Sequence, residues 1–268
     1  MTTVLLEKRD ATALITLNRP EAMNAISKAL RRDFIAAFEN CIDDPSIRVV
    51  VITGNGKAFS AGFDLKELSE ASPDTDNGSA NENSNETAAD KVTNDMARVI
   101  ERFKGPVIAA VNGHAVTGGF ELALACDVII ASEHARFADT HARVGILAGW
   151  GLSQRLPRLI GISRAKELSF TGNPLFADKA YEWGLVNHVV PADELVEFAL
   201  TMAKDMSACV PHVLEQYKAL IDDGFSMHFN EAMEYEEKTA IESAKQASAH
   251  MIAARREKVI ERGREQKD

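Results

Sequence analysis

Apolar runs alternate with polar turns along the N-terminal part of the chain, and their spacing predicts a hairpin, a helix and a strand. Residues 4–6 and 13–17 are apolar and flank a polar turn, which is typical of a β-hairpin. Apolar side chains then recur at helical spacing through residues 28–42, and Ser27 precedes them as a suitable N-cap. The largely β-branched run 48–53 predicts a strand that is buried on both faces.

The same succession recurs further along the chain. Residues 107–111 and 128–131 predict two more buried strands, and residues 118–126 between them predict a helix that follows a glycine turn. Three later helices and one strand are expected at 163–169, 178–183, 192–206 and 185–190. Repeated strand, turn and helix units predict an α/β fold. Because the C-terminal pattern is almost wholly helical, we divide the chain into a core of residues 1–200 and a helical region of residues 201–268.

One segment of the core is predicted to be a loop insertion. Residues 69–90 are rich in Ser, Asn, Asp and Glu and contain hardly any apolar side chain. Such a segment cannot bury enough apolar surface to offset the conformational entropy lost on ordering. It carries no residue pattern suited to chemistry, so we predict a surface loop that the fold tolerates.

Composition and charge exclude several classes of function. The 268 residues carry a formal net charge of −10, which argues against general nucleic-acid binding because that requires clustered Lys and Arg. Cys41, Cys126 and Cys209 lie far apart, without the paired spacing of a disulfide framework or a zinc site. No apolar run has the length of a membrane span, and residues 1–10 do not resemble an export signal. We therefore expect a cytoplasmic protein with no nucleic-acid or membrane partner.

Two glycine-containing turns carry the strongest chemical signal. Residues 53–65 and 111–121 each follow a predicted buried strand, and in both a small residue and a glycine precede the next element. Such a turn can leave backbone N–H groups free to face a ligand, and two converging N–H groups suit an oxyanion. The alternative is that the glycines only permit tight turns. Neither segment has the ordered G-x-G-x-x-G fingerprint of a dinucleotide site.

These turns belong to a longer series of motifs. The series comprises LNRPEAMNA at 17–25, AFSAGFDL at 58–65, a block at 112–127 that ends in ELALACD, the triplets ARF, GIL and QRL within 135–156, and TG and GLV within 171–186. In this order the motifs resemble the crotonase (enoyl-CoA hydratase/isomerase) superfamily. The resemblance runs from residue 4 to about residue 190 and is far more specific than a single glycine motif.

The resemblance implies a fold and a ligand. Members of the superfamily form a spiral of repeated ββα units (the ClpP/crotonase type), followed by helices that join subunits into trimers or hexamers. Their substrate is an acyl-CoA thioester, so we expect no cofactor beyond its CoA moiety and no metal. By residue-for-residue match, the backbone N–H groups of Phe63 and Gly118 would form the oxyanion hole. The residues along the adenine side of the CoA would be Ala22, Met23, Ala61, Asp64, Leu65 and Lys66.

The resemblance also implies an acid and a base. Enoyl-CoA hydratases of the superfamily use two glutamates, and Glu121 matches the first of them; a structural alternative is a glutamate stabilised by the helix dipole. The second position holds His141, which departs from the usual hydratase pattern. An imidazole exchanges protons near neutral pH and could supply a proton or position a water, with Asp139 as a possible partner. The alternative is a structural polar residue.

We therefore expect an enoyl-CoA hydratase-like enzyme that adds water to a 2-enoyl-CoA in the syn sense, through an enolate held in the oxyanion hole. Three alternatives stay open: an enoyl-CoA isomerase, a hydrolase of C–C bonds in β-diketones, and a crotonase that binds acyl-CoA without turnover. The β-diketone hydrolases carry a histidine close to the position of His141. The dehalogenase branch needs an aspartate nucleophile where this chain has Gly149, and neighbouring Trp150 would either line the acyl pocket or pack in the core.

Overall fold

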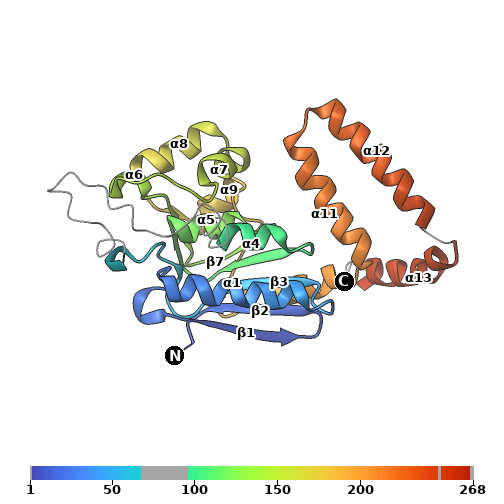
Figure 1. Ribbon diagram of the computed structural model, residues 1–268, viewed down its shortest axis with the longest axis horizontal. Helices are drawn as coiled ribbons and strands as arrows, with labels where there is room; N and C mark the ends of the chain where they lie inside the picture. The colour runs from blue at the N-terminus through green and yellow to red at the C-terminus, as the bar shows by residue number, and fades with distance from the viewer. Residues whose placement is uncertain (1, 68–95, 247–248, 266–268) are drawn as a thin grey trace, which may run out of the picture. The chain divides into compact units, whose positions relative to one another are not determined.

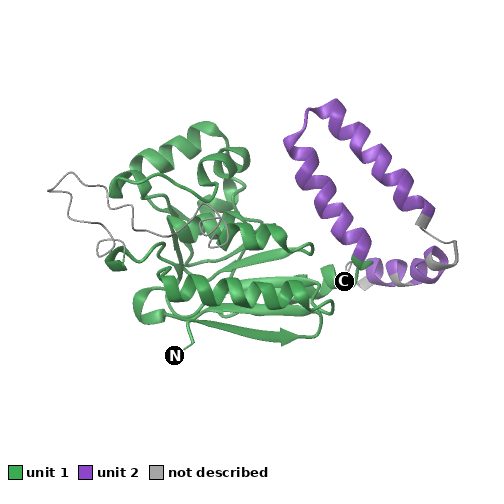
Figure 2. Ribbon diagram, viewed as in Figure 1, with its two compact units in different colours: residues 1–211 green, residues 212–268 purple. Residues whose placement is uncertain are grey.

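The computed structural model describes residues 2–67, 96–246 and 249–265, which form two compact units (Figure 1, Figure 2). The first unit comprises Met1–Pro211 and the second His212–Asp268. The loop predicted at 69–90 lies wholly within the gap at 68–95 and so outside the described residues. The division falls beyond the boundary predicted after residue 200, because the helix that spans this boundary packs on a sheet of the first unit.

A six-stranded sheet supports the first unit. Its strands, in spatial order, are β1 (Val4–Arg9), β2 (Thr12–Leu17), β3 (Val49–Gly54), β5 (Val107–Val111), β7 (Val128–Ser132) and β10 (His188–Val190). β1 and β2 form the predicted antiparallel hairpin, and all later neighbours in this sheet are parallel. β3 is buried on both faces as predicted, with Val50 and Ile52 in one hydrophobic cluster and Val49 and Val51 in another.

A second sheet of four short strands carries the turns of interest. Its strands, in spatial order, are β4 (Ala58–Ser60), β6 (His114–Val116), β8 (Arg136–Ala138) and β9 (Leu175–Phe176). β4, β6 and β8 are parallel, and β9 is antiparallel to β8. The pairs β3–β4, β5–β6 and β7–β8 each place one strand in each sheet, so the chain winds through both sheets in repeated turns. This arrangement confirms the predicted spiral of ββα units.

Helices cover both faces of the six-stranded sheet. The helices given by the described residues of the first unit include the 3₁₀ turn η1 (Pro20–Ala22), α1 (Lys28–Asp43), α4 (Met96–Arg102), α5 (Gly118–Leu124), α6 (His141–Val144), α7 (Leu152–Ile160), α8 (Ile162–Thr171), α9 (Ala177–Glu182) and α10 (Leu195–Ser207). Ser27 caps α1 as predicted, because its Oγ accepts the N–H of Leu30 at 3.1 Å. α1 belongs to the larger hydrophobic cluster, whereas α10 inserts Leu195, Ala199 and Ala203 into the cluster on the opposite face.

The described residues of the second unit are almost wholly helical. It consists of α11 (Pro211–Ser226, whose first residue closes the first unit), α12 (Phe229–Gln246) and α13 (Ala249–Glu265). The Tyr235 hydroxyl donates to Asp223 at 3.1 Å and joins α12 to α11. Large apolar side chains of these two helices are exposed, among them Tyr217, Phe225 and Phe229. In the parts of the chain described here, no helix combines the length and apolar character of a membrane span.

Candidate active site

The two glycine turns meet at one edge of the second sheet. β4 and β6 are parallel neighbours, so the turns that follow them leave the sheet at the same end. Gly62 lies in the first turn with φ +85°, and Gly118 begins α5 after the second. A methyl group added at Gly62 would overlap the Thr117 hydroxyl oxygen. Glycine is therefore required at position 62 both by the backbone angle and by the close approach of the two turns.

Among the residues that the structure describes, each of the two turns contains a predicted oxyanion-hole N–H without a backbone acceptor. Ile26 and Phe63 form a parallel bridge, in which the Ile26 N–H donates to Gly62 O (2.7 Å) and the Asp64 N–H donates to Ile26 O (3.2 Å). The Phe63 N–H takes no part in this bridge. Gly118 is the first residue of α5, a position at which helix geometry leaves the N–H unpaired. The two residues predicted for the oxyanion hole thus lie on adjoining turns.

Glu121 lies on α5, one helical turn after Gly118, and is completely buried. Its Oε1 accepts the N–H groups of Trp150 (2.7 Å) and Leu152 (3.4 Å). Its Oε2 is also buried and has no hydrogen-bond partner within the described part of the chain. An unpaired buried carboxylate oxygen is costly, and a bound water or ligand would satisfy it.

His141 approaches the same carboxylate from the start of α6. Its Nε2 lies 3.5 Å from Glu121 Oε2, at the outer limit of hydrogen bonding, and its Nδ1 lies 2.7 Å from Asp139 Oδ1. The His141 backbone N–H also donates to Asp139 Oδ1, at 3.2 Å. All three side chains are buried. Asp139 therefore fixes the orientation of the ring, and the other ring nitrogen is directed at Glu121.

These contacts control the protonation of the imidazole. Burial favours neutral His141, but the hydrogen bond with Asp139 and the nearby carboxylates of Glu121 and Asp139 outweigh burial and raise the pKa of His141 to about 9. Burial likewise acts to raise the pKa of Asp139, yet hydrogen bonds with His141 and Ser169 hold it below its ordinary value. At neutral pH His141 is therefore an imidazolium between two acidic side chains, which makes it a proton donor.

Five of the residues predicted along the CoA lie on two adjoining segments. The Ala61 N–H donates to Met23 O at 2.9 Å and so joins the N-terminal segment to the first glycine turn. Ala22 ends η1 beside Met23, and Leu65 and Lys66 are exposed just beyond the turn. The structure brings these residues together. The sixth residue, Asp64, lies on the same turn, and its carboxylate is bonded within the protein, to Arg19 and to the Lys66 N–H.

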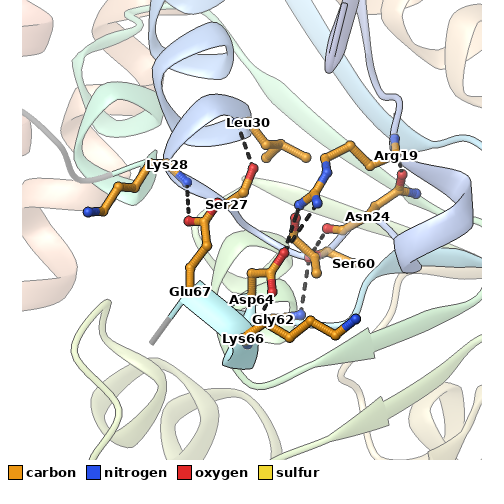
Figure 3. Close-up of polar contacts among 11 residues, drawn as sticks. Arg19, Asn24, Ser27, Lys28, Leu30, Ser60, Gly62, Asp64, Lys66 and Glu67 are labelled. Carbon is orange, nitrogen blue, oxygen red and sulfur yellow. Dashed lines mark hydrogen bonds and ion pairs between the residues drawn. The ribbon is translucent and has the colours of Figure 1, made fainter. Parts of the chain in front are cut away.

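Two residues at this junction, Arg19 and Asn24, were not predicted from the sequence as functional candidates. The Arg19 guanidinium lies 3.2 Å from Asp64 Oδ2 and donates to Ala25 O at 2.7 Å (Figure 3). The side chain of buried Asn24 donates to Ala58 O at 2.7 Å. No spacing rule relates positions so distant in sequence. The one available signal was that both residues belong to the motif at 17–25.

Other reactive groups lie outside this constellation. Among the described residues, no group of three or more His, Cys, Asp or Glu side chains is arranged to hold a metal ion. Cys41, Cys126 and Cys209 are free thiols. Burial, and then the charge of Asp44, raise the pKa of the Cys41 thiol to about 11, so it stays protonated and unreactive at neutral pH.

The chain is similar to one family of proteins over almost its whole length. The sequence model of the enoyl-CoA hydratase/isomerase family matches residues 7–261. A relative from Arabidopsis thaliana, named probable enoyl-CoA hydratase 1, peroxisomal, is 38% identical over 236 residues, which cover 85% of this chain and 81% of the relative.

Solved structures show the same similarity. An enoyl-CoA hydratase from Bacillus anthracis has a TM-score of 0.83 at 34% identity, with 96% of both chains covered. A monofunctional enoyl CoA isomerase from M. smegmatis has a TM-score of 0.72 at 34% identity, with 87% of this chain and 99% of the isomerase covered. Together with the two-sheet spiral, these similarities confirm the resemblance seen in the sequence. The chain belongs to the enoyl-CoA hydratase/isomerase family, a family of enzymes within the crotonase superfamily.

Proposed function

We propose that this protein is an enoyl-CoA hydratase that adds water to the double bond of a 2-enoyl-CoA. The observation that carries the proposal is the 3.5 Å contact between Glu121 Oε2 and His141 Nε2, one helical turn from the oxyanion-hole turns. The thioester oxygen would accept the N–H groups of Phe63 and Gly118, and the acid–base pair would act on the neighbouring carbons. The relatives named enoyl-CoA hydratases support the same reaction.

The proposed reaction balances with these groups alone. Glu121 takes a proton from water as the water oxygen bonds to the β-carbon, and the electrons of the double bond move into the thioester to give an enolate. His141 donates its Nε2 proton to the α-carbon, which restores the carbonyl of the 3-hydroxyacyl-CoA product. Because the two groups are adjacent, both additions occur on one face, which is syn addition. The proton on Glu121 then returns to His141, so no cofactor beyond the CoA moiety is needed.

The oxyanion hole supplies the largest single stabilisation in this proposal. Negative charge grows on the thioester oxygen as the enolate forms, and fixed N–H dipoles stabilise that charge without reorganising. Loss of one such donor typically costs about 3 kcal/mol in the barrier. Gly62 keeps the two donors close, since any side chain there would separate the turns.

Crotonoyl-CoA tests the proposal directly. We expect the absorbance of its conjugated thioester to decay as 3-hydroxybutanoyl-CoA accumulates, with product identity checked by chromatography. A protein that binds CoA thioesters but leaves crotonoyl-CoA unchanged would instead be a binding protein on the crotonase scaffold.

Isomerisation is the second candidate function. The contact between Glu121 and His141 forms a single proton shuttle, which is enough to move a proton from the α-carbon of a 3-enoyl-CoA to its γ-carbon. The similarity to the M. smegmatis isomerase supports this candidate as well. With 3-hexenoyl-CoA, a rise in conjugated absorbance without a 3-hydroxy product identifies an isomerase. A hydratase alone leaves that compound unconverted.

Trp150 is expected to limit the size of the acyl group. Its backbone N–H binds Glu121, and its half-buried ring packs 4.9 Å from the Phe63 ring, so it contacts both halves of the proposed site. Trp150→Ala should raise the ratio of kcat/KM for 2-decenoyl-CoA over crotonoyl-CoA at least about tenfold, since a removed aromatic wall is worth more than 1.4 kcal/mol of discrimination. Trp183→Ala, which removes a partly buried ring that contacts Arg164 and the core, is the matched control and should leave the ratio unchanged. An unchanged ratio in an active Trp150→Ala enzyme would assign Trp150 to packing alone.

We also propose that the protein assembles as a trimer or a hexamer. The exposed apolar residues of α11 and α12, including Tyr217, Phe225 and Phe229, need a cover that their own helices do not provide. Light scattering should give a mass three or six times that of one chain, and Phe225→Asp together with Phe229→Asp should lower it. A monomeric mass for the wild-type protein with full activity contradicts this proposal.

A further inference from the structure

Arg19 contacts both segments of the Ile26–Phe63 bridge, one at Ala25 and the other at Asp64. Its Nη1 donates to Ala25 O at 2.7 Å, and both Nη1 and Nη2 lie 3.2 Å from Asp64 Oδ2 (Figure 3). The Arg19 and Asp64 side chains are only 21% and 15% exposed. A doubly contacted pair with this little exposure is more directional than a surface ion pair, because water and salt screen it less.

The points held by Arg19 flank the Phe63 bridge. Ala25 precedes Ile26, and Asp64 follows Phe63, so one guanidinium fixes both sides of the Ile26–Phe63 pairing. On either side of Phe63, the N–H groups of Gly62 and Asp64 are engaged, whereas within the described residues the Phe63 N–H is not. The direction of that N–H is therefore set by its anchored neighbours.

Asn24 reinforces the same junction. Its Oδ1 accepts the Arg19 N–H at 2.8 Å, and its carbonyl oxygen accepts the Ser60 hydroxyl at 2.9 Å. The Ser60 Oγ in turn accepts the Gly62 N–H at 3.2 Å (Figure 3). A continuous network thus runs from Arg19 to the residue directly before Phe63.

Asp64 has no carboxylate oxygen left unbonded. Its Oδ2 contacts Arg19, and its Oδ1 accepts the Lys66 N–H at 3.2 Å. A carboxylate engaged in this way is poorly placed to bind a ligand as well.

We propose that Arg19 and Asp64 form a positioning clamp that holds the Phe63 N–H in the direction needed to bind the enolate oxygen. The clamp does not contact the CoA. The inference rests on the oxyanion hole of the proposed function and assigns Arg19 and Asp64 as positioning residues for it.

Two ligands separate positioning from ligand contact. Coenzyme A lacks the acyl group, whereas acetoacetyl-CoA forms an enolate whose negative oxygen would occupy the oxyanion hole. We would measure the affinities of both by calorimetry for the wild-type protein, Arg19→Met, Asp64→Asn, the double variant and Arg19→Lys. Arg102→Met, which breaks the exposed pair with Glu39, is the matched control. Circular dichroism and thermal melting would establish that each variant is folded.

The clamp predicts a selective loss. Arg19→Met and Asp64→Asn should each weaken acetoacetyl-CoA binding by about 10- to 100-fold, because a small misplacement of a donor has effects of this size. Coenzyme A affinity should stay within about twofold of wild type. The double variant should lose no more than the worse single variant, since the two residues act as one unit. Arg19→Lys should recover part of the loss, because an ammonium keeps the charge but not the double contact.

Other outcomes overturn the clamp. Equal weakening of coenzyme A and acetoacetyl-CoA would show that Arg19 and Asp64 bind the CoA, and additive losses would show that they act separately. Affinities that match those of Arg102→Met would remove any role in the hole. Should Arg19→Met not fold, Asp64→Asn and Arg19→Lys carry the same comparison.

The measurement needs no turnover, so it is distinct from the test of hydration. If the wild-type protein does not hydrate crotonoyl-CoA but the variants show the selective loss, the clamp is supported and the hydratase assignment is wrong. If the wild-type protein binds acetoacetyl-CoA no more tightly than coenzyme A, it has no oxyanion hole, and the proposal of a positioning clamp is wrong.

Discussion

Replacing Glu121 with Gln is expected to lower kcat for crotonoyl-CoA hydration by about 100- to 10,000-fold, the range that general acid–base catalysis contributes. The amide keeps the size of the side chain, and its oxygen can still accept the Trp150 N–H, but it cannot take a proton from water. Coenzyme A affinity should change little, because Glu121 is assigned to the reacting carbons rather than to the nucleotide. Steady-state kinetics and calorimetry give the two quantities separately.

A surface glutamate provides the control for this variant. Glu182 forms an exposed pair with Lys179 on α9, and Glu182→Gln should retain wild-type kcat. If Glu121→Gln also retains it on the true substrate, Glu121 is a structural residue and the proposed mechanism is wrong.

The second large effect concerns pH. If protonated His141 is the acid, kcat/KM of the wild-type enzyme should fall as the pH rises through about 9, where His141 loses its proton. His141→Ala should lower kcat about 10- to 100-fold, less than Glu121→Gln, and should abolish this basic limb. A profile of kcat/KM against pH for both proteins measures the effect. An unaltered profile in His141→Ala would remove His141 from the mechanism.

Asp139→Asn offers an independent check on the same assignment. The hydrogen bond that His141 Nδ1 donates to Asp139 is the largest influence that raises the pKa of His141, so its loss should move the basic limb towards neutral pH without removing it.

The free energy of unfolding should depend on pH through the same group. The folded-state pKa of His141 lies above its ordinary value of 6.5, so the contacts of protonated His141 with Asp139 and Glu121 stabilise the fold fully below pH 6.5. That contribution should be lost as the pH rises through about 9.

Elements with a strong pattern of their own were predictable from the sequence. α1 repeats its apolar residues at helical spacing and has Ser27 as its cap, and β3 and β5 are continuous apolar runs. Such patterns reflect burial against a core, so they appear in the residues themselves. α7 was not predicted, because Pro157 lies inside it and interrupts the helical signal.

The second sheet was visible only in the structure. β4, β6 and β8 have three residues each, too few for a period of two to be recognised. These strands exist because their neighbours supply hydrogen bonds across the sheet, and those neighbours are distant in sequence. The convergence of the two glycine turns depends on this pairing.

The sequence by itself determined the superfamily, the spiral fold and the candidates Phe63, Gly118, Glu121 and His141. The first three belong to ordered motifs of neighbouring residues, and His141 lies between two such motifs. Only the tertiary structure decided what these candidates contact. Asp139, His141 and Glu121 meet in a buried chain that reverses the effect of burial on the imidazole pKa. Arg19 contacts Asp64, which lies 45 residues further along the sequence. Charge pairs of this kind depend on distance and burial in three dimensions, which no local pattern records.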